Sequence, residues 1–131
     1  MTNPSALSGT TSTGLAPNIA GTLAYVLGPI TGVIFLVLER ENRFVRFHAA
    51  QSIVTGVLMI ALSIGLSIVS TMLAFVPILG WLAAILLSFV IGFGSLALWL
   101  VLMWRAFQGD EWELPVAGAL ARRLAPARVA S

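Results

Sequence analysis

The feature that most constrains the fold is a long tract without charge: no Asp, Glu, Lys or Arg occurs between Phe47 and Trp104. A second uncharged run, from Asn18 to Leu38, precedes it. A soluble domain needs polar faces around its core, and a chain of 131 residues could not bury that much uncharged sequence. Only 9% of the residues are charged and 59% are hydrophobic. The sequence therefore predicts an integral membrane protein, with the lipid bilayer as its first partner.

Two breaks divide these runs into predicted helices. Gly28-Pro29 lies near the middle of the first run and predicts a kink there, because proline removes a backbone donor. Val76-Pro-Ile-Leu-Gly80 predicts a tight reversal in the longer run. The expected fold is all-α, an integral bundle of three transmembrane helices plus a short C-terminal interfacial helix over residues 116–125. The three predicted spans are residues 18–38, 48–75 and 81–104.

The predicted membrane domain, residues 18–125, lies between two tails. The N-terminal tail, residues 1–17, is rich in Ser, Thr, Gly and Pro, which predicts flexibility. The C-terminal tail is residues 126–131. All seven basic residues are Arg, and each lies either between the first two spans or after the third. By the positive-inside rule, three spans in the cell membrane would place the C-terminus in the cytoplasm and the N-terminal tail outside.

Several function classes lack the residues that they need. The chain has no cysteine and one histidine, so neither a thiolate site nor a His-rich metal site is expected. The net charge is only +2, and three arginines interleaved with two glutamates do not form the broad basic face that nucleic acid requires. The serines of the spans have no histidine or carboxylate at matching depth. We therefore expect no enzyme, no cofactor and no nucleic-acid partner.

Small residues in the spans indicate helix–helix packing. Gly28 and Gly32 form a small-xxx-small pair, and three hydroxyl side chains four residues apart share one face of the second span. We favour packing of this hydroxyl stripe against another helix; the alternative is that each hydroxyl bonds the carbonyl four residues earlier. The residues expected at helix contacts are Gly28, Gly32, Gly56, Ser63, Ser67, Thr71 and Gly92.

The charged residues at the predicted cytoplasmic face suggest a second kind of contact. Arginines of the first loop could form bidentate pairs with carboxylates that follow the third span. The alternative, a set of solvated charges that contribute under about 1 kcal/mol each, is equally favoured. His48 lies beside this loop, where an anchoring role is favoured over a proton shuttle or a ligand. The residues of the possible ion pairs are Arg40, Arg43, Arg46, Asp110, Glu111 and Glu113.

Two stretches carry a family resemblance: Glu41-Asn-Arg-Phe-Val-Arg-Phe-His-Ala-Ala-Gln-Ser52 and Leu102-Met-Trp-Arg-Ala-Phe-Gln-Gly109 with Leu114-Pro115-Val-Ala-Gly118. They resemble the Tic-twenty-like family of small prokaryotic membrane proteins, which are related to a chloroplast inner-envelope import component. The resemblance implies a bundle of a few membrane helices, and its plastid relatives are implicated in a protein-conducting channel. The residues marked by this motif are Arg43, Phe44, Arg46, Phe47, His48, Gln51 and Ser52.

The function expected from these features is that of a small multi-pass membrane protein without a catalytic site. It would act as a structural, accessory or assembly subunit that packs against a larger membrane complex or against itself. The alternative is an oligomeric channel or protein-translocation component, motivated by the family resemblance and the hydroxyl stripe.

Overall fold

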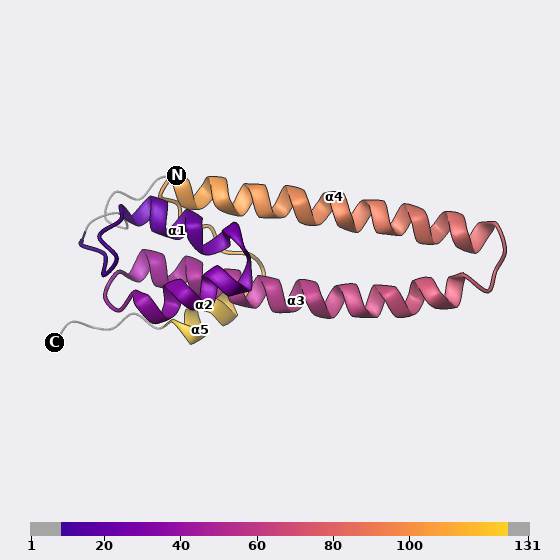
Figure 1. The fold of residues 1–131 in the computed structure, drawn as a ribbon, viewed down its shortest axis with the longest axis horizontal. Helices are drawn as coiled ribbons and strands as arrows, with labels where there is room; N and C mark the ends of the chain where they lie inside the picture. The colour runs from indigo at the N-terminus through magenta and orange to yellow at the C-terminus, as the bar shows by residue number, and fades with distance from the viewer. Residues whose placement is uncertain (1–8, 126–131) are drawn as a thin grey trace.

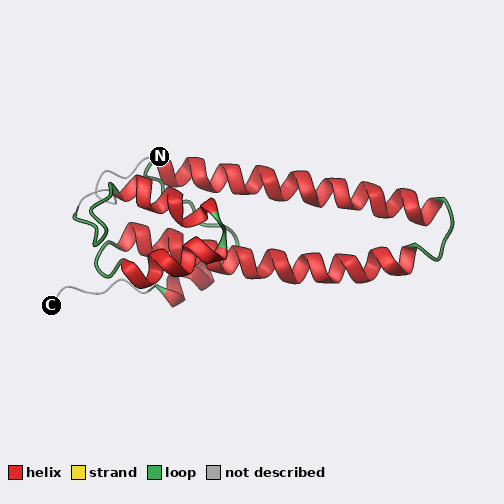
Figure 2. Cartoon of the chain, viewed as in Figure 1, coloured by secondary structure: helices red, strands yellow, loops and turns green. Residues whose placement is uncertain are grey.

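The chain folds into five α-helices in a computed structural model, which describes residues 9–125. The predicted tail at 126–131 and residues 1–8 of the N-terminal tail lie outside the described residues. Every regular element of the described part is helical (Figure 2). The all-α expectation is therefore confirmed. The helices are α1 Pro17–Val26, α2 Pro29–Leu38, α3 Arg43–Leu73, α4 Leu79–Phe107 and α5 Ala117–Leu124.

Helices α3 and α4 form a long antiparallel hairpin, and the three short helices gather around one end of it (Figure 1). We call this end, made by α1, α2, α5 and the adjoining ends of α3 and α4, the cap. We call the opposite part of the hairpin, residues 57–101, the arm. The buried side chains lie mainly in the cap, where Phe44, Phe47 and Tyr25 are almost fully enclosed.

The arm has almost no core of its own. Large apolar side chains on both of its helices are exposed, from Val57 and Leu58 near the cap to Phe75 at the far turn. In the most apolar window of α3 only 11% of the residues are buried, and in that of α4 only 6%. A core helix of a soluble protein would be mostly buried, so these two helices have the length and composition of membrane spans.

The single helix predicted over residues 18–38 is not found; two helices that fold back on each other replace it. At 10 residues each, α1 and α2 are about 15 Å long and neither can cross a bilayer core. Gly28 has φ +62°, which favours glycine, and Pro29 begins α2. The Gly28-Pro29 break is thus a full reversal where a kink was predicted, and the described chain has two candidate spans where three were expected.

Side chains from three helices make this reversal possible in apolar surroundings. The Thr31 hydroxyl accepts from the Leu27 N–H at 3.1 Å and donates to the Ala24 carbonyl at 3.0 Å. Ser52 of α3 donates to the Gly28 carbonyl at 2.8 Å, and Trp99 of α4 donates to the Tyr25 carbonyl at 2.6 Å. Backbone groups freed in a membrane helix are tolerated where neighbours bind them in this way.

The cap brings both ends of the described chain to the same end of the hairpin. Residues 9–16, the loop between α2 and α3, and the segment after α4 all lie there, while the α3–α4 turn lies at the far end (Figure 1). The threading predicted from three spans placed the N-terminal tail and the C-terminal segment on opposite sides. With α1 and α2 folded back, residues 9–16 and 108–125 lie at one end of the hairpin.

Glycine sets the distance between the reversal and α3. A Cβ at Gly56 would lie 2.5 Å from Cδ of the rigid Pro29 ring, and a Cβ at Gly32 would lie 2.9 Å from the Ala49 carbonyl oxygen. We therefore expect Gly56→Ala to push α3 away from the reversal and lower the free energy of unfolding by about 1–3 kcal/mol, measured by thermal unfolding in a mild detergent.

Gly65→Ala is the matched control. Gly65 lies on α3 like Gly56, but a Cβ at Gly65 would meet nothing within 4 Å. It should be neutral or stabilising by up to about 1 kcal/mol, since alanine is the better helix former. Equal effects of the two substitutions would contradict the close approach of α3 to Pro29.

Candidate functional site

Three buried polar side chains form the centre of the cap, and we call Tyr25, His48 and Gln51 the polar cluster. The Tyr25 hydroxyl lies 2.8 Å from Nδ1 of His48, and Nε2 of Gln51 donates to the same hydroxyl at 3.0 Å. His48 and Gln51 are fully buried and Tyr25 almost so. The cluster joins α1 to α3 by hydrogen bonds that the surrounding apolar side chains shield from water.

The polar cluster also holds the segment between α4 and α5. His48 Nε2 lies 3.0 Å from the Asp110 carbonyl oxygen, and Gln51 donates to the Trp112 carbonyl at 3.0 Å. The Leu114 N–H donates to Oε1 of Gln51 at 3.1 Å. These backbone groups lie outside the helices, so the side chains of α3 supply partners that a helix would have supplied.

The hydrogen bonds assign the tautomer of His48. Since Nε2 faces a carbonyl oxygen, it must carry the proton, and Nδ1 then accepts from the Tyr25 hydroxyl. The ring is enclosed edge-on by Phe44, Phe47 and Tyr25, at centroid distances of 4.5, 5.1 and 5.6 Å. Both nitrogens of a neutral imidazole are thus occupied inside the protein, which fits the anchoring role favoured from the sequence.

The loop between α2 and α3 is folded inward. The Glu39 carboxylate accepts hydrogen bonds from the N–H groups of Ser12, Glu41 and Asn42 and from the Ser12 hydroxyl, at 2.9 to 3.2 Å. Burial alone would raise the pKa of the Glu39 carboxyl, but these hydrogen bonds outweigh it and lower that pKa below its ordinary value. Arg46 donates to the carbonyls of Leu36 and Glu39 at 3.2 and 2.7 Å.

The motif residues therefore converge on the cap. The aromatic rings of Phe44 and Phe47 flank His48. Arg46 binds a carbonyl near the C-terminal end of α2, and Ser52 binds the Gly28 carbonyl at its N-terminal end. Arg43 is different, because its side chain is 61% exposed and its one ion pair within residues 9–125 is with Glu111, at 3.9 Å. The structure thus gives most of this motif a role in holding the short helices to α3.

The carboxylates after α4 pair mainly with arginines of their own C-terminal stretch. Asp110 lies 2.8 Å from Arg105, and Arg122 binds both Glu111, at 3.4 Å, and Glu113. The Arg43–Glu111 contact is the one expected pair between the two segments that the structure brings within 4 Å, and at that exposure it is worth under about 1 kcal/mol. Arg46 binds carbonyls instead, and Arg40 forms no ion pair within residues 9–125.

The residues expected at helix contacts behave in two ways. Gly32 and Gly56 lie at close approaches within the cap, and Gly28 forms the reversal. Ser63, Ser67 and Thr71 are exposed on the arm, where each hydroxyl donates to the carbonyl four residues earlier at 2.8 Å. Packing of this hydroxyl stripe against another helix was favoured from the sequence. The structure instead shows the alternative, in which each hydroxyl bonds the carbonyl four residues earlier, and the stripe stays exposed within the described chain.

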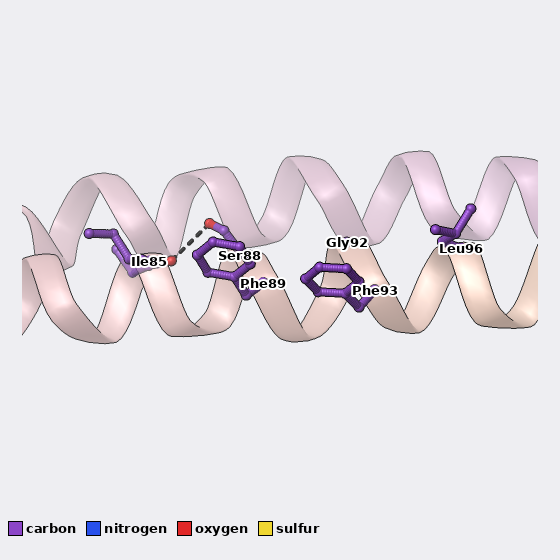
Figure 3. Close-up of a pocket in the computed structure, with 7 residues that line it drawn as sticks. Ile85, Ser88, Phe89, Gly92, Phe93 and Leu96 are labelled. Carbon is purple, nitrogen blue, oxygen red and sulfur yellow. Dashed lines mark hydrogen bonds between the residues drawn. The ribbon is translucent and has the colours of Figure 1, made fainter.

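Gly92 lies in a groove on the arm, and every residue that lines this groove belongs to α4 (Figure 3). We call it the α4 groove; its volume is about 490 Å³. Small residues recur four apart along it, and the stacked rings of Phe89 and Phe93 form one wall. Ser88 donates its hydroxyl proton to the Ala84 carbonyl at 2.8 Å, so that proton is not available to a partner in the groove. The lining residues are Ala84, Ile85, Ser88, Phe89, Gly92, Phe93 and Leu96.

Sequence reasoning did not single out Tyr25 or Glu39 as members of these networks. Tyr25 is the only tyrosine and lies within an apolar run, so nothing in the pattern marked its hydroxyl as a partner of His48. Glu39 was assigned to a charged surface loop, yet it is fully buried. Asn42 could have been found, because it precedes the helical pattern and its side chain accepts from the Val45 N–H at 3.2 Å as a helix cap.

Within residues 9–125, no group of three or more His, Asp or Glu side chains could hold a metal ion.

Comparison with known proteins places these elements in a family context. A model described as the magnetosome magnetite crystal formation protein family matches residues 10–121. A UPF0132 membrane protein of Methanocaldococcus jannaschii is 43% identical over 115 residues, which cover 88% of this chain and 94% of that protein. A UPF0132 membrane protein of Archaeoglobus fulgidus is 38% identical over 106 residues, 81% of this chain and 92% of that protein. No solved structure matches the chain.

The resemblance to the Tic-twenty-like family is wrong. The matching family model covers the chain from residue 10 to residue 121, the archaeal relatives cover 88% and 81% of the chain, and none of them is Tic-twenty-like. The motif that suggested it is short, and its residues serve to close the cap around α3. Such a requirement for packing can recur in membrane proteins of different families.

The polar cluster leads to a direct test. Tyr25→Phe removes the hydroxyl that bonds both His48 and Gln51 and leaves their polar atoms buried without that partner. We expect the free energy of unfolding in mild detergent to fall by about 1–3 kcal/mol. Amide hydrogen exchange over residues 108–116 should rise, because Gln51 and His48 hold that segment.

Ser63→Ala is the control, because it removes an exposed hydroxyl that bonds only its own helix. It should leave both measurements close to those of the unaltered chain. If Tyr25→Phe behaves like Ser63→Ala, the polar cluster does not hold the cap together.

Proposed function

The chain belongs to the magnetosome magnetite crystal formation protein family, and from that premise we propose that it is a non-enzymatic membrane subunit that assembles through its arm and holds its cap at one membrane surface. The family description names magnetite crystal formation, whereas the archaeal relatives are named only as membrane proteins. Embedding in a membrane is the property that both descriptions allow. The proposal is therefore an assembly role within the bilayer.

The exposed arm is the observation that carries this proposal. Residues 57–73 of α3 would extend about 25 Å and residues 79–101 of α4 about 34 Å, close to the roughly 30 Å of a bilayer core. Their apolar side chains are exposed, and neither segment contains a charged residue. Lipid tails, or other apolar helices in the bilayer, are the surroundings in which such a surface is stable.

The distribution of arginine supports one orientation. The six arginines of the described chain all lie in or beside the cap, and the far turn around Pro77 has no charge. The positive-inside rule then favours a cytoplasmic cap in the cell membrane. On this threading α1 and α2 enter the membrane from the cytoplasmic side and return to it, so the N-terminal segment is cytoplasmic too, in place of the outside location expected from three spans.

The α4 groove supports assembly through the arm. Ala84, Ser88 and Gly92 follow one another at intervals of four residues, and such rows let the backbones of two membrane helices approach closely. A hairpin of two helices leaves most of its surface to lipid, so a second copy packed along this groove would gain contacts at little cost. We therefore favour a homo-oligomer joined through α4.

The channel alternative has lost one of its two sources of support. The family resemblance that suggested it is replaced by a different family. The other source, the hydroxyl stripe, is weaker than expected, because Ser63, Ser67 and Thr71 each donate their proton to their own helix and keep only acceptor sites for a polar path.

Cysteine cross-linking in membranes tests assembly, because the chain has no cysteine of its own. We expect Ser88→Cys to form a disulfide-linked dimer on mild oxidation, since the two α4 grooves would face each other. Adding Gly92→Leu should abolish the dimer by filling the groove. Gly65→Cys, on an open part of α3, is the matched control and should stay monomeric.

Equal cross-linking at residues 65 and 88 would indicate random collision. A dimer that persists in the Ser88→Cys, Gly92→Leu double variant would mean that the groove is not the contact. Either result would overturn assembly through α4.

A further inference from the structure

A second groove lies where the cap meets the arm, between α3 and α5. We call it the α3–α5 groove; its volume is about 360 Å³. Six of its seven lining residues are aliphatic, and the seventh is an arginine. It continues onto the arm at Val57 and Leu58, where α3 leaves the cap and its apolar side chains become exposed. The lining residues are Ile53, Val54, Val57, Leu58, Leu120, Arg123 and Leu124.

Small residues hold α5 close to α3 and so keep this groove in shape. Ala117, Gly118 and Ala121 are buried on the inner face of α5. A Cβ at Gly118 would lie 2.6 Å from Cγ of Glu113 and 3.1 Å from Oε1 of Gln51, so the helix cannot move closer to the polar cluster. The outer face instead carries Leu120 and Leu124, which are 39% and 54% exposed. Its apolar outer face and its arginines are the pattern of a helix that lies in a membrane interface.

The two arginines of α5 differ in what they bind. Arg122 binds Glu111 and Glu113, and its guanidinium carbon lies 4.4 Å from the ring centre of Phe47. Arg123 is exposed and forms no ion pair within residues 9–125. It is also the only charged side chain of the α3–α5 groove. An uncompensated guanidinium at the edge of an aliphatic groove is complementary to a ligand with a negative head and an apolar tail.

We propose that the α3–α5 groove binds one acyl chain of an anionic phospholipid whose phosphate is bound by Arg123. The aliphatic residues bury the chain, and the guanidinium matches the oxygens of the phosphate. A free phosphate ion would use Arg123 alone and leave the rest of the groove empty. The inference rests on the proposed placement of the arm in the bilayer, which puts this groove beside the headgroups of the cytoplasmic leaflet.

Lipid binding to the full-length chain in mild detergent, measured by native mass spectrometry, tests the proposal. The probes are dioleoyl phosphatidylglycerol and dioleoyl phosphatidylcholine. We expect phosphatidylglycerol to bind more tightly, and Arg123→Gln to weaken that binding about fivefold. Arg40→Gln is the matched control, because it removes another exposed arginine that also lacks an ion pair within the described chain but does not line this groove. It should change the affinity little.

Filling the groove tests the position of the acyl chain. Val57→Trp should weaken phosphatidylglycerol binding while every arginine remains, and Leu58→Phe is a second filling variant should the first not fold. Excess inorganic phosphate should not displace the lipid from the unaltered chain.

Equal losses in Arg123→Gln and Arg40→Gln would reduce the effect to general surface charge and overturn the site. Full binding in a folded filling variant, or displacement by inorganic phosphate, would overturn the bound acyl chain. These measurements are made in detergent and do not depend on which way the arm crosses a membrane. Failure of the lipid site and failure of assembly through α4 are therefore separate results.

Discussion

The need to bind backbone polar groups in apolar surroundings governs this structure. The chain departs from helix within the cap at Leu27–Gly28, at the loop of residues 39–42 that Glu39 and Arg46 hold, and along residues 108–116. At Leu27–Gly28, Thr31 binds the Ala24 carbonyl, and Ser52 and Trp99 add hydrogen bonds to the carbonyls of Gly28 and Tyr25; along residues 108–116, His48 and Gln51 bind backbone groups. Tyr25 links the first and the last of these places, because its carbonyl belongs to the reversal and its hydroxyl to the polar cluster. Non-helical backbone is stable in a membrane protein only with such partners.

This arrangement divides the molecule into two parts that differ in how far their side chains are buried. The cap contains the hydrogen-bond networks and nearly all of the buried side chains, while the arm exposes apolar residues along its whole length. The family match from residue 10 to residue 121 includes both parts together with most of α5. The two grooves follow from the same division. One lies on the arm, where helices could meet, and the other lies at its border with the cap, where an arginine adjoins aliphatic residues.

The length of the uncharged runs predicted the long helices α3 and α4 well, but it predicted the short helices α1 and α2 poorly. The absence of charge from Phe47 to Trp104, with breakers at Pro77 and Gly80, was enough to locate α3, α4 and their turn. Residues 18–38 satisfied the same length criterion, although they form two helices. At Gly28-Pro29 distant side chains add hydrogen bonds to the carbonyls of the reversal. Those side chains, Ser52 and Trp99, lie 24 and 74 residues away from their partners.

The sequence singled out the α3 residues of the candidate site but not the groups to which they hydrogen-bond. Phe44, Arg46, His48, Gln51 and Ser52 were singled out together, and they do meet in the cap. Their contacts with Tyr25 and with the backbone of residues 110–114 are set by the fold. Glu39 shows the same limit, since a carboxylate in a charged loop gives no sign that four hydrogen bonds will enclose it.

The central claim is that α1 and α2 return to the side from which they enter, so that the chain crosses the bilayer only with α3 and α4. Thiol labelling of intact cells with a membrane-impermeant reagent tests it, using single cysteines at Leu15, Pro77 and Ala119 of this cysteine-free chain. The account predicts labelling at residue 77 from outside, and labelling at 15 and 119 only after the membrane is permeabilised. Labelling of residues 15 and 77 from the same side would show that residues 17–38 cross the bilayer, and would contradict it.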